Sequence, residues 1–166
     1  MSTPSAVRVG IVLPEAHFGE EEWRNAENAL IYADEAASKG VQLLLYPEGY
    51  PGPMTGPLDN PKFPFNPVEE LKKKAKDHAM YIIAGDVTES EMPGAYLLNL
   101  RMFSPEGKEI ACYLRQQPDT PPLNAYLYGG KGHLLPGQSP CVVETELGKI
   151  GLQICSELWV PELPRL

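Results

Sequence analysis

Residues 41–48 read VQLLLYPE, a nearly continuous apolar run that ends in a proline and a glutamate. A run of this kind, with little polar alternation, is typical of a strand that is buried on both faces of a sheet. Residues 7–13 (VRVGIVL) form a similar run, and a helical pattern fills the stretch between the two, from about residue 20 to Gly40. Strand, crossover helix and strand together predict a βαβ unit with parallel strands.

Further elements follow along the chain. They are a helix from Pro67 to about Met80 and strands at residues 81–85, 95–103, 110–114, 141–146 and 149–155. Most of the 18 prolines and 15 glycines fall between residues 47 and 67 or between 118 and 140, which indicates two long loops. The pattern predicts one α/β domain over residues 1–166, with a mixed sheet and helices on one face.

The composition argues against several classes of function. A formal net charge of −8 disfavours nucleic acid as a partner, because phosphate binding needs a basic surface. No apolar run is long enough to span a bilayer and no signal pattern opens the chain, so we expect a cytoplasmic protein without membrane contact. Cys112, Cys141 and Cys155 are odd in number and lack metal-ligand spacing, so we expect reduced thiols and no metal or other cofactor. Cys112 and Cys141 lie inside apolar strand patterns, which favours inert core positions.

Two residues at predicted strand ends are candidates for chemistry. Glu48 follows a buried strand directly, and ligands of open α/β sheets bind outside the carboxyl ends of such strands. Cys155 ends the last predicted strand and is followed by Ser156 and Glu157. A thiol near a carboxylate at a strand end is a candidate nucleophile–base pair. A core cysteine and a solvated glutamate are the alternatives that these residues alone leave open.

The motifs of the chain, taken in order, resemble those of the nitrilase superfamily of carbon–nitrogen hydrolases. Asn25, residues 35–40 (EAASKG) and residues 43–48 (LLLYPE) are similar to the first motif of that family. Residues 135–137 (LPG) and 146–155 (ELGKIGLQIC) are similar to its approach to the nucleophile, and residues 155–157 (CSE), with Pro161, Glu162 and Arg165, to the segment that follows. The resemblance covers essentially the whole chain. It implies part of a four-layer α-β-β-α sandwich.

The resemblance also implies a mechanism. Cys155 would attack the carbon of a small amide or nitrile and form a thioester-type intermediate. Glu48 would accept the thiol proton, pass it to the leaving amine and then activate water. A lysine and a backbone N–H beside the nucleophile would stabilise the oxyanion. The family further suggests a homo-oligomer.

The sequence departs from this pattern at the lysine. Counting from Tyr113 places Arg115 at the lysine position, where a guanidinium keeps the charge but replaces a compact ammonium with a planar fork. Lys131, in the stretch KGHL, gives a rival alignment, and a surface arginine at a strand end is the plain alternative for Arg115. The family also has a second acid in the segment before the Pro-Gly pair. Gly129 and Gly130 occupy that neighbourhood here, and Asp119 is the nearest acid.

The chain also ends early relative to the family pattern. Leu166 lies 11 residues after Cys155, whereas the family fold continues with further strands and helices, so we expect a C-terminally truncated domain. Two hypotheses follow from the sequence. One is an amidase- or nitrilase-type hydrolase that uses Cys155, Glu48 and Arg115. The other is a non-catalytic or degenerate relative that serves as a binding or assembly module.

Overall fold

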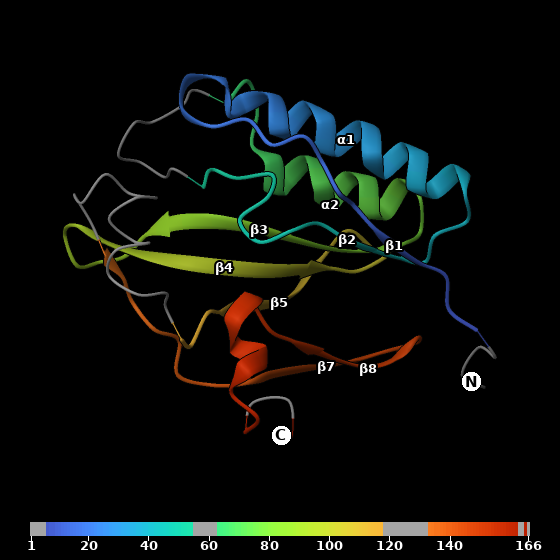
Figure 1. The fold of residues 1–166 in the computed structure, drawn as a ribbon. Coiled ribbons are helices and arrows are strands. Elements are labelled where there is room, and N and C mark those ends of the chain that lie inside the picture. Colours follow the sequence, from blue (N-terminus) through green and yellow to red (C-terminus); the bar gives the residue numbers. More distant parts are fainter. Residues whose placement is uncertain (1–5, 55–62, 118–132, 163–164, 166) are drawn as a thin grey trace.

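The computed structural model describes residues 6–54, 63–117, 133–162 and 165 (Figure 1). Its elements are β1 (Val9–Ile11), η1 (Gly19–Glu21), α1 (Trp23–Ser38), β2 (Leu43–Leu45), α2 (Pro67–Asp77), β3 (Tyr81–Glu89), β4 (Ala95–Phe103), β5 (Glu109–Leu114), β6 (His133–Leu134), β7 (Cys141–Thr145), β8 (Gly148–Leu152) and η3 (Cys155–Trp159). Both predicted helices and all predicted strands are present. The short strand β6 lies in a stretch that the sequence indicated as loop.

The main sheet is mixed, as predicted. Strands β1, β2 and β3 are parallel, with Ile11 opposite Leu45 and Leu45 opposite Ile83, so the predicted βαβ unit is confirmed. Strand β4 then runs antiparallel to β3, and β5 antiparallel to β4. Strand β6 pairs in parallel with the first residues of β4, so it continues the side of the sheet that β5 occupies.

Helices α1 and α2 cover one face of this sheet (Figure 1). Helix α1 faces the sheet with a stripe of buried alanines, Ala26, Ala29, Ala33 and Ala36, spaced by three or four residues. Because alanine has only a Cβ, this stripe lets the helix backbone approach the sheet closely. Helix α2 begins at Pro67 and is capped by Asn66, whose Oδ1 accepts from the backbone N–H of Val68 at 3.0 Å.

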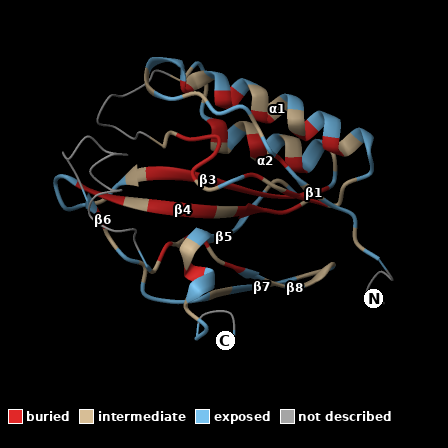
Figure 2. Cartoon of the chain, in the orientation of Figure 1, coloured by how far each residue is buried: buried red, intermediate tan, exposed pale blue. Residues whose placement is uncertain are grey.

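The hairpin of β7 and β8 packs against the opposite face of the sheet (Figure 1). Its side chains alternate: Val143 and Ile150 pack into the core, whereas Val142 is 54% exposed. Strands β3 and β4 therefore lie between two apolar layers, and Figure 2 shows them buried along most of their length. Helices, sheet and hairpin form three of the four layers that the resemblance implied, with the helices on one face as predicted.

The last predicted strand ends earlier than expected. Strand β8 stops at Leu152, and Cys155 is the first residue of the 3-10 helix η3. The apolar pattern continues to Ile154, which is buried, so the sequence predicted a longer strand. The hydrogen-bonded pairing with β7 ends at Leu152. Cys155 therefore lies in the first turn of η3 and not on the strand. Among the described helices, none is both long enough and apolar enough to cross a membrane.

Candidate active site

Glu48 is held at the carboxyl end of β2 by its neighbours on both sides. Tyr46 is buried, and its hydroxyl donates to the carbonyl of Ala29 in α1 at 2.5 Å. On the other side, Gly49 has a φ of +66° and passes so close to β3 that a Cβ on Gly85 would lie 2.6 Å from the Gly49 nitrogen. These contacts fix the backbone of the β2 loop where it presents the Glu48 carboxylate.

Arg115 follows β5 directly and is almost fully buried, with 2% of its side chain exposed. Its Nη1 donates to Glu48 Oε1 at 2.7 Å, and its Nη2 donates to Ser156 Oγ at 2.7 Å. Its Nε donates to the carbonyl of Gln117 at 2.8 Å. The guanidinium fork thus joins the loop after β2 to the turn after β8, a geometry that a lysine ammonium does not reproduce. The alternative of a surface arginine is wrong.

The backbone around Arg115 is also fixed. Its N–H donates to the carbonyl of Leu98 in β4 at 3.1 Å, and its carbonyl accepts from the N–H of Gly137 at 2.8 Å. A Cβ at Gly137 would lie 2.2 Å from the carbonyl oxygen of Leu114, so only glycine fits this approach. The pair Pro136-Gly137 therefore lies directly beside the arginine.

Cys155 opens η3 with a φ of 53°, a left-handed conformation that non-glycine residues rarely adopt. The Glu48 carboxylate and the backbone N–H of Ser156 both lie close enough to its thiol to influence the thiol pKa. Cys155 is exposed, yet the protein around its thiol excludes part of the solvent and so raises the pKa of the thiol, and the nearby Glu48 carboxylate raises this pKa further. Ser156 N–H and the charge of Arg115 oppose this rise in the pKa.

Glu48, Arg115 and Cys155 therefore meet, although 67 residues separate the first two and 40 the last two. A protonated thiol beside a carboxylate is the arrangement that a general base needs in order to create a thiolate during attack. A buried guanidinium and a backbone N–H next to the sulfur are suited to an oxyanion that develops at the same place.

Glu157, the other acid near the thiol, is engaged by other groups. Its side chain is fully buried, and its two oxygens accept four hydrogen bonds from other groups of the protein. The sequence places Glu157 near the nucleophile but does not indicate these contacts, because three of the four donors lie about 40 residues away in the chain. The candidate base is Glu48.

Cys112 and Cys141 differ from Cys155 in their surroundings. All three thiols are free. Cys112 is exposed, so the prediction of an inert core position for Cys112 was wrong. It lies on the face of β5 that points away from the β7–β8 hairpin. Partial loss of solvent around each thiol raises the pKa of both Cys112 and Cys141. Lys131, Asp119, Gly129 and Gly130 lie outside the described residues, as do 55–62 and 118–132 of the long loops.

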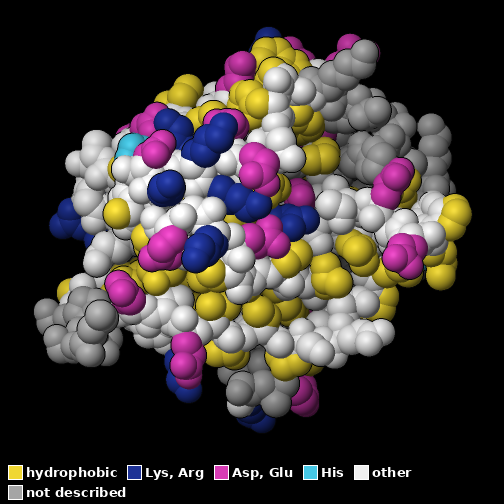
Figure 3. Space-filling model, turned by 180° about the vertical axis from the view of Figure 1, so that it is seen from behind, with side chains coloured by type: hydrophobic (Ala, Val, Ile, Leu, Met, Phe, Trp, Pro, Cys, Tyr) yellow, Lys and Arg dark blue, Asp and Glu magenta, His cyan; other side chains and the backbone are white. Residues whose placement is uncertain are grey.

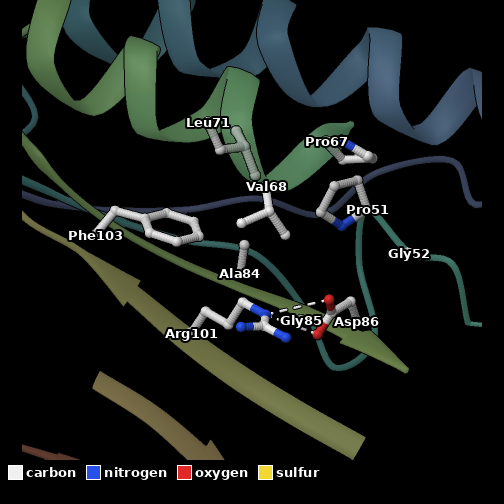
Figure 4. A pocket seen from close by; sticks show the side chains of 10 residues that line it. All are labelled: Pro51, Gly52, Pro67, Val68, Leu71, Ala84, Gly85, Asp86, Arg101 and Phe103. Carbon is white, nitrogen blue, oxygen red and sulfur yellow. Dashed lines mark hydrogen bonds and ion pairs between the residues drawn. The ribbon is translucent and has the colours of Figure 1, made fainter. Parts of the chain in front are cut away.

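A small depression lies on the helix face of the sheet and is separate from this site. Pro51, Val68 and Leu71 line its apolar side, and Asp86 and Arg101 line its polar side (Figure 4). Arg101 Nε donates to Asp86 Oδ1 at 3.0 Å. None of the three candidate catalytic residues lines this depression. In the described part of the chain, no group of three or more His, Cys, Asp or Glu side chains could hold a metal ion.

Comparison with known proteins gives one family. The sequence matches the carbon-nitrogen hydrolase family over residues 8–166. A hydrolase from Schizosaccharomyces pombe is 29% identical over 95% of this chain and 50% of its own length. The human omega-amidase NIT2 is 26% identical over 86% of this chain and 52% of its own length. The chain therefore spans about half the length of the curated relatives it matches.

Solved structures of an amidase from Nesterenkonia sp. share the fold. One superposes with a TM-score of 0.73 at 19% identity, covering 96% of this chain and 59% of that chain. A cysteine-to-alanine variant of that amidase, solved with butyramide, gives a TM-score of 0.74 at 19% identity and covers the same shares of the two chains. Another variant, with glutamate changed to glutamine, carries the acetamide moiety of fluoroacetamide on its active-site cysteine.

Proposed function

Because the chain belongs to the carbon-nitrogen hydrolase family, we propose that it cleaves a non-peptide carbon–nitrogen bond of a small amide through Cys155. A nitrile is the second substrate class that this chemistry accepts. The observation that carries the proposal is the position of the Arg115 guanidinium, which donates to Glu48 Oε1 at 2.7 Å and to Oγ of Ser156, the residue after Cys155, at 2.7 Å. The relatives named as amidases support the amide.

In the proposed reaction the Cys155 sulfur attacks the amide carbon while its proton moves to Glu48. The carbonyl oxygen becomes an oxyanion, which Arg115 and the backbone N–H of Ser156 stabilise. Glu48 then gives the proton to the leaving ammonia, and a thioester remains on Cys155. Glu48 next takes a proton from water, whose oxygen attacks the thioester and releases the carboxylic acid. No cofactor enters these steps.

We propose residues 1–166 as part of a single family domain, and we extend the proposal to the protein's surroundings. The three free thiols suit a reducing compartment such as the cytoplasm. Self-association is supported by exposed apolar side chains close to the site: Leu158 is 65% and Trp159 is 86% exposed. A band of hydrophobic side chains also lies on the back face, beneath interspersed acidic and basic groups (Figure 3).

The proposal is tested with butyramide and hydroxylamine, by measuring hydroxamate formation and the mass of the acyl-enzyme. The parent chain should acquire one acyl group and form hydroxamate, and Cys155→Ala should do neither. Cys112→Ala is the matched control, since it removes another exposed thiol that does not contact Glu48 or Arg115 in the described structure. Absence of acylation in the parent would favour the non-catalytic binding or assembly module instead.

A further inference from the structure

Glu157 makes an unusual set of contacts for a side chain with no exposed surface. Its Oε1 accepts from the Tyr113 hydroxyl at 2.9 Å and from the backbone N–H groups of Gln116 and Gln117 at 2.6 and 3.1 Å. Its Oε2 accepts from the N–H of Ile154 at 2.7 Å. Four donors converge on one carboxylate, which offsets the cost of removing its charge from water.

These contacts join the two segments that carry the candidate catalytic groups. Ile154 and Glu157 flank Cys155 and Ser156 in the nucleophile turn, whereas Gln116 and Gln117 directly follow Arg115. The carbonyl of Gln117 in turn accepts from Arg115 Nε at 2.8 Å. The contacts therefore form a closed ring, which runs from Glu157 through the Gln117 peptide to the guanidinium and back to the turn at Ser156.

We propose that Glu157 is a positioning residue, which holds the Arg115 guanidinium against Glu48 and the nucleophile turn through the Gln116–Gln117 backbone. The proposal rests on the proposed function, because it assigns Glu157 to the same site. Glu157 touches neither the sulfur nor a reacting atom in this scheme, and we assign its effect on the thiol to Arg115 rather than to its own contact with the Ile154 N–H. Its effect must therefore disappear when Arg115 is absent.

Tyr113 supports the direction of these bonds. Burial raises the pKa of the Tyr113 hydroxyl, and the hydrogen bond and charge of Glu157 raise it further, so the hydroxyl remains a donor. Glu157 must then be the acceptor toward every partner it has here. A glutamine at position 157 would keep one acceptor oxygen, but its amide group would turn N–H donors toward a backbone N–H. Glu157→Gln therefore breaks at least one of the four contacts.

The test is a double-mutant cycle on the reactivity of Cys155. Iodoacetamide alkylation of Cys155 is measured against pH in the parent, Glu157→Gln, Arg115→Met and the double variant, and the modified cysteine is located by peptide mass mapping. The charge of Arg115 favours the thiolate and that of Glu48 disfavours it. Both single variants should therefore move the pH profile upward and lower the rate at neutral pH, by about fivefold. The double variant should equal Arg115→Met alone.

Two further variants distinguish the positioning of Arg115 by Glu157 from a general loss of protein stability. Asp86→Asn alters another buried acid, on the helix face of the sheet, and should lower stability without moving the profile. Tyr113→Phe removes one donor only, so it should fold even where Glu157→Gln does not, with a smaller shift in the same direction.

The outcomes distinguish this inference from the proposed function. Additive effects, an unmoved profile in Glu157→Gln or Tyr113→Phe, or an equal shift in Asp86→Asn would overturn the positioning role of Glu157 alone. A pH profile of Cys155 alkylation that is the same in Arg115→Met as in the parent would overturn the roles of both Arg115 and Glu157. Acylation by butyramide tests the hydrolase function by itself, because it does not depend on the identity of residue 157.

Discussion

Replacing Arg115 by methionine removes a buried guanidinium while keeping a long apolar side chain. The variant loses the ion pair to Glu48 and the bonds to Ser156 and the Gln117 carbonyl. Removing one partner of a buried pair costs about 3–5 kcal/mol. The Glu48 side chain is 25% exposed, so water can solvate it in part, and we expect a loss of about 3 kcal/mol in the free energy of unfolding.

Urea unfolding followed by tryptophan fluorescence measures this loss, and Arg101→Met is its matched control. Arg101 lies between Asp86 and Glu109, with 18% of its side chain exposed, so its removal should destabilise the fold comparably. Of these two variants, Arg115→Met should slow the alkylation of Cys155 and Arg101→Met should not. Arg115→Lys should recover part of this reactivity and little of the stability, because one ammonium cannot replace the three-way fork.

Two results would contradict this role of Arg115. The first is an Arg115→Met variant whose unfolding free energy lies within about 0.5 kcal/mol of the parent, the range of ordinary surface substitutions. The second is an Arg101→Met variant that slows Cys155 alkylation as much as Arg115→Met does. Either result would mean that the guanidinium does not couple Glu48 to the nucleophile turn.

Three substitutions test the scaffold, each by urea unfolding. Gly137→Ala places a Cβ 2.2 Å from the Leu114 carbonyl oxygen and should cost about 3 kcal/mol; a neutral effect would contradict the close approach. Tyr46→Phe removes the hydroxyl that donates to Ala29 and should cost about 1 kcal/mol, and an unchanged midpoint would mean that this bond contributes nothing. Asn66→Ala removes the α2 cap and should also cost about 1 kcal/mol, whereas Asn66→Asp should retain most of the stability.

Local pattern was sufficient to predict most of the fold. The apolar run before Glu48 could only be a strand buried on both faces, and this placed the carboxylate at a strand end. The helical pattern between about residue 20 and Gly40 indicated α1, although the helix begins at Trp23 because a 3-10 turn precedes it. Cys155 was placed correctly near Glu48, but in a turn and not on a strand.

The remaining features depend on contacts that no local pattern encodes. Glu157 is fixed by donors about 40 residues away, and nothing in the sequence around it distinguishes this acid from a solvated one. Cys112 has the sequence context of a core residue, yet it lies on the open side of β5, because α1 and α2 pack over the other strands. The number of strands that helices cover is decided by tertiary packing.

The most direct test of the account is the pH dependence of Cys155 alkylation by iodoacetamide in the parent and in Glu48→Gln, with Cys112 as the internal reference. Partial loss of solvent around the Cys155 thiol raises its pKa, and the adjacent Glu48 carboxylate raises it further. Removing that negative charge should lower this pKa, so the profile of Glu48→Gln should move to lower pH and alkylation at neutral pH should become faster, while acylation by butyramide is lost. Cys112 should keep its profile in both proteins. A Cys155 profile that does not change with residue 48, or that shifts together with Cys112, would contradict a coupled nucleophile and base.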